Sequence, residues 1–184
     1  MYRFFDLFFL FFFSIPIIIL FCFIYLLCLV FQGKPIFFSQ NRGGFNNKKI
    51  TIYKFRSMKK LKNKMKITPL GKFLRIYKLD EIPQFYSVLI GELSLVGPRP
   101  LHYEYKSMYN KKQKKRFLVN PGLTGYTQVF LKNNDSWTKK LEYDVWYVHN
   151  KNIALDLKIL LKTIYNIISK RSDEKLPKKF NGRN

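Results

Sequence analysis

The sequence predicts a small mixed α/β domain with short strands, attached to an N-terminal helix that is embedded in a membrane. Two observations predict this fold class. Residues 7–31 contain no Asp, Glu, Lys or Arg, whereas residues 34–184 contain 33 basic and 10 acidic residues. Within the basic part, short runs typical of strands alternate with segments whose apolar residues recur at helical spacing. We therefore divide the chain into a membrane segment, residues 1–33, and a domain, residues 34–184, that is long enough to bury its own core.

The composition excludes several classes of protein. The chain is 47% apolar and 18% aromatic, which is too rich in buriable side chains for a disordered polycation. Its only cysteines, Cys22 and Cys28, lie inside the apolar run, so a secreted domain held by disulfides is excluded. A cleavable signal peptide fits poorly, because the apolar run is too long and no small-residue cleavage site follows it.

The apolar run is long enough to cross a bilayer, which takes ~20 residues. Basic residues follow it, and the positive-inside bias places the domain in the cytoplasm. Ser14 and Pro16 lie about a third of the way along the run. Proline favours a kink, and the Ser14 hydroxyl is close enough to satisfy the carbonyl that Pro16 frees. From the segment alone a spanning helix is favoured, and a bent helix that enters and leaves one leaflet is the alternative.

The first half of the domain is expected to start with short strands at residues 35–38 and 50–53, joined by a turn-rich segment. A basic loop is expected at residues 59–66. Thr68 is expected to cap a helix that begins at Pro69. A second short helix should begin at Asp80 and end at Gly91.

The second half is expected to hold rigid loops at residues 96–100 and 120–125, with a basic helix between them at residues 103–117. Apolar residues at helical spacing over residues 153–168 predict an amphipathic helix. Its simplest interpretation is a core element. The alternative is contact with a membrane surface, which lysines on its other face favour.

Several kinds of catalytic site are excluded by residue types. The only histidines are His102 and His149, and both cysteines lie in the apolar run, so no Cys/His metal cluster and no convincing nucleophilic triad can form. The chain has neither a Walker-type glycine loop nor a dinucleotide fingerprint. What remains is a few carboxylates and arginines, and arginine suits bidentate contact with phosphate.

Asp80 and Glu81 are the carboxylates with two open interpretations. Asp is a favoured helix cap, and Pro83 suits the first turn that would follow it. The functional interpretation uses the same place, because a helix N-terminus keeps a carboxylate ionised, as a nucleophile or Mg²⁺ ligand must be. Glu81 could then hold the metal or move a proton.

The loops around Arg99 and around Gly122 each have a structural and a functional interpretation. Prolines on both sides of Arg99 fix the backbone and aim the guanidinium, which suits a phosphate clamp, although a turn with a solvated arginine is the simpler interpretation. The loop with Gly122 and Thr124 could be a linker, but glycine also lets a backbone approach a ligand closely.

Six blocks follow one another over nearly the whole chain: residues 40–44 (QNRGG), 54–58 (KFRSM), 79–84 (LDEIPQ), 91–100 (GELSLVGPRP), 121–125 (PGLTG) and 141–148 (LEYDVWYV). Together they resemble the small monotopic phosphoglycosyl transferases, the bacterial sugar transferase family that starts glycan assembly on a polyprenol carrier. The ending at residues 179–182 (KFNG) is similar to members that transfer a diacetylated bacillosamine phosphate.

The resemblance implies a two-step reaction. Asp80 would attack the sugar-bearing phosphorus of a UDP-sugar and release UMP, and polyprenyl (undecaprenyl) phosphate would then take the phosphosugar from Asp80. Mg²⁺ would be held in part by Asp80 or Glu81, and Glu81 would accept a proton. The residues implied in phosphate binding are Arg99, Arg75, Arg56, Pro98, Pro100, Gly122 and Thr124.

The resemblance also implies a place in the cell. The membrane segment would be a re-entrant helix-break-helix with its break at Ser14 and Pro16, in the bacterial inner (plasma) membrane. The catalytic domain would then lie on the cytoplasmic face and carry out the first membrane step of glycoprotein, O-antigen or capsule assembly. Lys78 departs from the family pattern, which usually has Ser two residues before the catalytic Asp.

Two other classes of function remain as alternatives. The net charge of +23 permits a membrane-tethered nucleic-acid-binding protein, and a non-catalytic membrane adaptor is also compatible with the anchor. Neither explains the acidic pair or the Arg99 loop, and no nucleic-acid-binding motif is present. We therefore expect no nucleic acid partner, and expect the basic surface to contact anionic membrane lipid.

Overall fold

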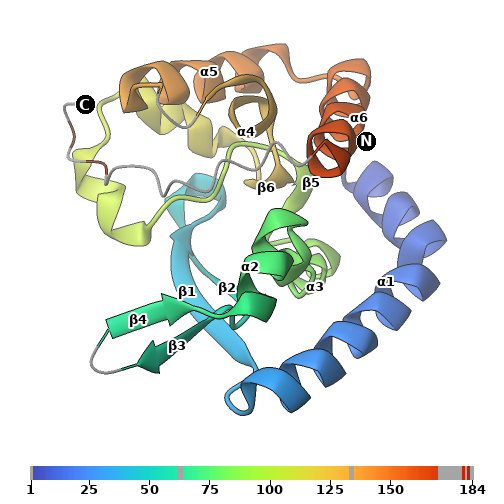
Figure 1. The fold of residues 1–184 in the computed structure, drawn as a ribbon. Coiled ribbons are helices and arrows are strands. Elements are labelled where there is room, and N and C mark those ends of the chain that lie inside the picture. The colour runs from blue at the N-terminus through green and yellow to red at the C-terminus, as the bar shows by residue number, and fades with distance from the viewer. Residues whose placement is uncertain (1, 62–63, 133–134, 170–179, 181, 183–184) are drawn as a thin grey trace.

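The computed structural model describes residues 2–61, 64–132, 135–169, 180 and 182 (Figure 1). The helices are α1 (Tyr2–Gln32), α2 (Pro69–Ile76), α3 (Gln84–Leu89), α4 (Tyr126–Phe130), α5 (Trp137–Asn150) and α6 (Ile153–Ile168). Four 3₁₀ turns accompany them: η1 (Phe45–Asn47), η2 (Leu79–Glu81), η3 (Tyr103–Met108) and η4 (Gln113–Leu118). The strands are β1 (Phe37–Gly43), β2 (Lys49–Phe55), β3 (Met58–Leu61), β4 (Lys64–Ile67), β5 (Ser94–Val96) and β6 (Gly122–Thr124).

The predicted fold class, a mixture of helices and short strands behind a long apolar helix, is confirmed. Within the described residues the strands form three two-stranded sheets. The pairs β1–β2 and β3–β4 are antiparallel, whereas β5 and β6 are parallel, with Ser94 opposite Gly122 and Val96 opposite Thr124. Strands near residues 35–38 and 50–53 are thus confirmed, and both run longer than predicted.

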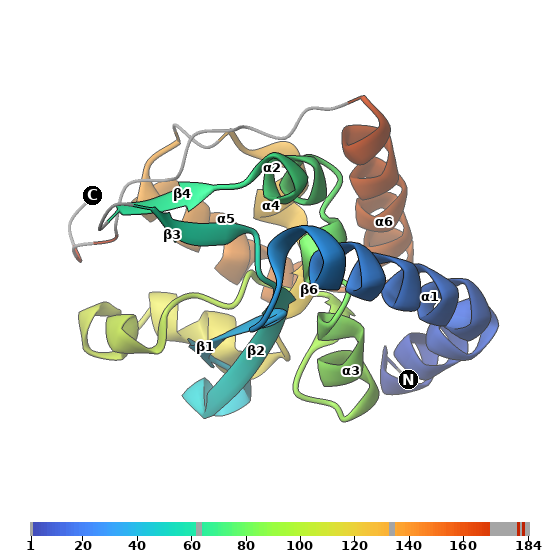
Figure 2. The same cartoon turned by 60° about the horizontal axis from the view of Figure 1, so that its bottom comes forward.

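The N-terminal helix α1 is apolar and long enough to cross a membrane. It is continuous from Tyr2 to Gln32, with Pro16 inside it, and its ribbon bends part-way along (Figures 1 and 2). A proline inside a helix is a common cause of such a bend. Ser14 donates a hydrogen bond to the carbonyl of Phe11 at 2.8 Å. The carbonyl four residues before Pro16 is that of Phe12, so the predicted partner for Ser14 is off by one residue.

Both ends of α1 are attached to the rest of the chain. At its start, Arg3 donates to the carbonyls of Val88 and Leu89 at the end of α3, and Asp6 accepts from the Leu95 amide of β5 at 3.0 Å. At its end, Arg56 Nη2 donates to the Gln32 and Gly33 carbonyls, at 2.7 Å each. The middle of α1 stays uncovered, and the side chains of Phe11 and Ile15 are 77% and 71% exposed.

The buried cores include residues of α1. Leu10 packs with Ile52, Leu95 and Ile159 in one cluster, and Ile24 and Cys28 pack with Phe55 and Leu74 in a second. A third cluster joins Tyr105, Phe117 and Leu141 with Phe180, near the end of the chain. The helix α1 thus shares its cores with the segments that follow it. The division of the chain at residue 33 stays a prediction.

In the first half of the domain one predicted element is wrong, and one predicted helix is present but begins later than expected. The basic loop over residues 59–66 is the β3–β4 hairpin, in which Met58 is opposite Ile67. A two-stranded ribbon can be solvated on both faces, so its strands can be rich in lysine. The sequence of these strands therefore lacks the alternating apolar pattern by which a strand is recognised. The helix expected to begin at Asp80 is instead the turn η2, followed by α3, which begins at Gln84. Thr68 caps α2 as predicted, and its side chain accepts from the Gly71 amide at 2.9 Å.

In the second half, the prediction of a basic helix over residues 103–117 is wrong. It is replaced by η3 and η4, and the segment η4 lies against α5. The loop at 96–100 follows β5, whose last residue is Val96, and the loop at 120–125 contains the strand β6. Glycines allow the close pairing of these two strands, because a Cβ on Gly122 would lie 2.1 Å from the Gly97 amide nitrogen. The sequence suggested that Gly122 lets a backbone approach a ligand closely. In the structure Gly122 instead allows the close approach of the Gly97 backbone.

The amphipathic helix over residues 153–168 is confirmed as α6, but its predicted role as a core element is only partly right. Ile159 is fully buried, whereas Leu161 and Ile168 are 69% and 73% exposed. Ile153, Leu157 and Ile164 of this helix are exposed as well.

Candidate active site

The acidic pair lies on the turn η2, directly after α2. Lys78 precedes the turn with φ 58° and ψ 18°, a left-handed conformation that reverses the chain. The turn closes with a hydrogen bond from the Glu81 amide to the Lys78 carbonyl at 3.1 Å. Asp80 is 7% exposed and makes no capping hydrogen bond, so the interpretation of Asp80 as a helix cap is wrong.

Cations from three different elements face this turn. Lys54, from β2, forms an ion pair with Glu81, and Arg99 Nη2 lies 3.6 Å from the same Glu81 oxygen. Arg75, at the end of α2, donates from Nε to the Ser57 hydroxyl at 2.8 Å and lowers the pKa of Asp80 by its charge. The tertiary structure thus brings Asp80, Glu81, Arg75 and Arg99 together.

The two carboxylates have opposite pKa shifts. Burial, and next the charge of Glu81, raise the pKa of Asp80 to about 6. Burial alone would raise the pKa of Glu81 too, but Lys54, Arg99 and Lys78 together lower it to about 2. A helix dipole therefore does not account for the state of Asp80. Near neutral pH Asp80 is still largely ionised, and it is the more basic of the two acids.

The Arg99 loop is held from both sides through its backbone. Arg116 Nη2 donates to the Arg99 carbonyl at 2.6 Å, and Arg42 Nη1 donates to the Pro100 carbonyl at 3.3 Å. The Gly122 amide donates to the Pro98 carbonyl at 3.1 Å. These contacts leave the Arg99 side chain 40% exposed and directed at Glu81.

Arg116 belongs to a buried network. Its Nε and Nη2 donate to Asp144 Oδ2 at 3.1 and 2.8 Å, and Thr127 donates to the other Asp144 oxygen at 2.8 Å. Arg116 and Asp144 are 2% and 4% exposed. Burial raises the pKa of Asp144, although Arg116 and Thr127 oppose the shift. The network connects α4 and α5 to the Arg99 loop.

Three of the predicted phosphate-binding residues are engaged elsewhere. Arg56 borders the large cleft described next, but its guanidinium Nη2 donates to the last carbonyls of α1. Gly122 lies against Gly97, as described above. The Thr124 hydroxyl shares a hydrogen bond of 2.7 Å with that of Thr163 on α6. No direct phosphate contact is therefore expected from the side chains of Arg56 or Thr124 in this arrangement.

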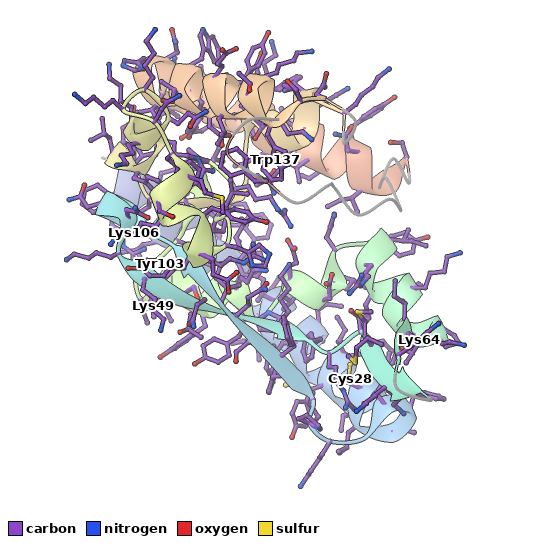
Figure 3. All side chains as sticks on the ribbon, turned by 90° about the vertical axis from the view of Figure 1, so that its left-hand side faces the viewer. Cys28, Lys49, Lys64, Tyr103, Lys106 and Trp137 are labelled. Atoms are coloured by element: carbon purple, nitrogen blue, oxygen red, sulfur yellow. The ribbon has the colours of Figure 1, made fainter. Side chains whose placement is uncertain are left out.

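A large cleft of about 2010 Å³ opens beside the acidic pair. Its polar part is bordered by Lys54, Arg75, Asp80, Glu81 and Arg99, and its apolar part by Phe9, Leu20, Phe85, Leu160 and Ile167. In Figure 3 Trp137, which borders the cleft, lies on the side of α5, and Lys64 lies across from it on the β3–β4 hairpin. One cleft thus joins charged groups to the apolar helix α1.

The acidic pair fits Mg²⁺ only together with a phosphate ligand. Within the described part of the chain no group of three or more His, Cys, Asp or Glu side chains could enclose a metal ion. Mg²⁺ is usually bound by one or two carboxylates together with substrate phosphates, and Asp80 and Glu81 supply such a pair. Because Glu81 is paired with Lys54, Asp80 is the more available ligand.

Comparison with known proteins decides the family. Residues 1–170 match the model of the family described as bacterial sugar transferase. The chain belongs to this family. The resemblance to bacterial sugar transferases, and with it the prediction of an enzyme, is confirmed. The similarity of residues 179–182 to members that transfer a bacillosamine phosphate stays a prediction, since the match ends at residue 170 and residues 179 and 181 lie outside the described residues.

This sugar transferase has relatives with named activities. The uncharacterized sugar transferase EpsL of Bacillus subtilis is 44% identical over 144 residues, which cover 74% of this chain and 71% of EpsL. A UDP-glucose:undecaprenyl-phosphate glucose-1-phosphate transferase of Klebsiella pneumoniae is 38% identical over 71% of this chain and 32% of that protein. A UDP-N-acetylgalactosamine-undecaprenyl-phosphate N-acetylgalactosaminephosphotransferase of Aeromonas hydrophila is 35% identical over 73% and 36%. The chain thus spans about a third of the length of the last two.

Sequence reasoning missed three cations of this sugar transferase. Lys54 pairs with Glu81, and Arg42 and Arg116 support the Arg99 loop. Lys54 and Arg42 stand in blocks that carried the family resemblance, which was the available signal. Arg116 lies among lysines in a basic run, and nothing local separates it from solvated neighbours.

Proposed function

We propose that this sugar transferase moves a sugar-1-phosphate from a UDP-sugar to undecaprenyl phosphate and releases UMP. The observation that supports this most is the Asp80–Glu81 turn, which borders one cleft with three cations and the apolar helix α1. The relatives from Klebsiella and Aeromonas act, by their names, on a UDP-sugar and undecaprenyl phosphate.

Asp80 is proposed to act as the nucleophile. A carboxylate oxygen of Asp80 attacks the sugar-bearing phosphorus, and the bond from that phosphorus to the oxygen bridging the two phosphates breaks, so that UMP leaves with the bridging oxygen. An oxygen of undecaprenyl phosphate then attacks the same phosphorus and displaces Asp80. A pKa of about 6 suits this role, since Asp80 is both ionised at neutral pH and more nucleophilic than an ordinary carboxylate.

Glu81 and the cations are proposed to organise the site. Lys54 and Arg99 keep Glu81 ionised, which makes Glu81 a weak proton acceptor as long as both pairs persist. Arg99 and Arg75 are proposed to bind the phosphates, since they face the turn and their guanidinium groups match phosphate geometry. Mg²⁺ would be held by Asp80 and Glu81 and would supply neutralisation of the diphosphate charge.

We further propose that α1 enters and leaves the same face of the bacterial plasma membrane. A straight helix of 31 residues is about 46 Å long, which would carry one end far from the domain. Here the start of α1 contacts α3 and β5, while its end contacts Arg56. The exposed apolar side chains of α6 fit contact with the same membrane, whose cytoplasmic face carries the anionic lipids that suit the basic surface.

The two topologies predict different positions for the N-terminus. If α1 enters and leaves the same face, a protease-cleavable tag before Met1 should be protected in intact spheroplasts and cleaved once the cells are opened. A second tag, placed after Asn184, should behave in the same way. Western blotting of both tags measures this outcome. Cleavage of the N-terminal tag in intact spheroplasts would show a spanning helix and leave the chemistry above unaffected.

The proposed reaction is tested with purified full-length protein in detergent micelles. We expect Mg²⁺-dependent UMP release from at least one member of a panel of UDP-sugars, which should include UDP-diacetylbacillosamine, when undecaprenyl phosphate is present. Rapidly quenched samples without the lipid should show a phosphosugar adduct by intact mass. Absence of UMP release across the panel would refute the reaction, whereas release without an adduct would indicate direct transfer.

A further inference from the structure

A small recess is bordered by Glu81 and by residues of β2, β6 and the Arg99 loop. Its volume is about 10 Å³, which is room for roughly one oxygen-sized atom. Arg42, Lys54, Arg99 and Gln84 border it together with Glu81 and Pro100. Three cations, one amide and one carboxylate therefore border this space, so positive charge is in excess at its walls.

Gln84 has an unused donor at this recess. Its side chain is 3% exposed, and its Nε2 is buried without a hydrogen-bond partner among the described residues. A buried donor left unpaired is costly, and native proteins rarely keep one without a purpose. Gln84 stands at the first position of α3, where the turn η2 fixes its direction.

Arg42 adds a charge that has no ion-pair partner among the described residues, although Glu81 attracts it from a longer distance. In the described ranges Lys54 and Arg99 pair with Glu81, but no acidic side chain is within ion-pair distance of Arg42. Its guanidinium donates to Gln40 and to the Pro100 carbonyl instead. Burial, and next the charge of Arg99, lower the pKa of Arg42 to about 10, so it stays protonated at neutral pH.

We propose that this recess receives one non-bridging phosphoryl oxygen of the substrate, with Arg42 and Gln84 as its hydrogen-bond donors. The excess of donors and positive charge favours an anionic oxygen over a water molecule, which would need acceptors as well. The inference rests on the proposed function and extends it, because it assigns substrate contacts to two residues outside the acidic pair and the Arg99 loop.

The test uses UDP, the part common to all UDP-sugar donors, titrated calorimetrically into full-length protein in micelles. We expect Arg42→Gln to weaken UDP binding about tenfold, since it removes a charged hydrogen bond. Lys49→Gln is the matched control: Lys49 lies on the strand paired with β1, is exposed, and is absent from the recess (Figure 3). This variant should bind UDP within twofold of the wild type.

Gln84 variants separate a phosphoryl oxygen from a water molecule. Gln84→Met removes the donor at similar volume and should weaken UDP binding severalfold. Gln84→Glu should weaken it further, because a carboxylate repels the phosphoryl oxygen. If the recess held only water, the new carboxylate would instead pair with Arg42 and leave UDP affinity unchanged, which would overturn the proposal.

Steady-state kinetics show which substrate supplies the oxygen. In a two-step transfer, a decrease in kcat/KM confined to the UDP-sugar assigns the oxygen to the diphosphate, and one confined to undecaprenyl phosphate assigns it to the lipid phosphate. Unchanged values for both substrates in Arg42→Gln and Gln84→Met would refute the recess as a substrate site. A wild-type protein that neither binds UDP nor releases UMP would refute the proposed function itself, and this recess proposal with it.

Discussion

Asp80→Asn is expected to reduce UMP release by at least about 10³-fold, because the variant keeps the shape of the turn but has no carboxylate oxygen to attack phosphorus. The phosphosugar adduct should disappear from the intact mass at the same time. UDP binding should persist, since the cations around Glu81 are unchanged. UMP release near the wild-type rate would exclude Asp80 as the nucleophile.

The same variant should change stability in a pH-dependent way. The pKa of Asp80 is about 6 in the folded protein against an ordinary value of 3.8, so the folded state holds its proton more tightly than the unfolded state. Folding therefore loses stability as the pH rises from about 4 to about 6, by at most about 3 kcal/mol. We expect Asp80→Asn to unfold at a higher temperature than the wild type at pH 7.5, and to show little difference at pH 4.

Thermal unfolding in micelles measures this difference, and a second variant controls for it. Asp135→Asn removes a partly exposed carboxylate whose pKa is lowered rather than raised, first of all by its hydrogen bond from Lys139. It should therefore not become more stable at pH 7.5. Equal melting temperatures for Asp80→Asn and wild type at both pH values would show that Asp80 is not strained by burial, and would weaken its assignment as an activated nucleophile.

Asp144→Ala is expected to have the largest effect on stability, about 3–5 kcal/mol, because it leaves the Arg116 guanidinium buried without its counter-charge. Arg116 and Asp144 are 2% and 4% exposed, so water cannot replace the lost partner. Chemical denaturation of the purified protein measures the loss. The exposed pair Lys139–Asp135 is the matched control, and Asp135→Ala should change stability little.

A double variant separates stability from positioning. Arg116→Met with Asp144→Leu replaces the buried ion pair by apolar side chains, which is often tolerated. We expect this variant to recover much of the stability lost in Asp144→Ala. Its KM for the UDP-sugar should still be raised, because the hydrogen bond that holds the Arg99 carbonyl is gone. Recovery of stability with an unchanged KM would show that the network has a structural role only.

The elements predicted correctly share strong local signals. The apolar helix, the Thr68 cap and the periodic residues of α6 are visible within one stretch of sequence, because each depends on neighbours a few residues apart. The β5–β6 pair and the buried Arg116 depend on residues far apart in the chain, so no local pattern indicates them. The lysine-rich β3–β4 hairpin was missed because its strands have no clear apolar face.

The sequence by itself predicted the long apolar helix and the family, and it singled out the acidic pair as the candidate site, since these follow from hydropathy and from ordered blocks of residues. Only the tertiary structure decided which cations serve that pair. Arg75 and Arg99 face the turn, Arg56 binds the end of α1, and Lys54 pairs with Glu81. The physical reason is that a guanidinium can donate to a carboxylate, a phosphate or a backbone carbonyl, so the sequence does not name its partner. Its partner is therefore set by what the fold places within hydrogen-bond distance.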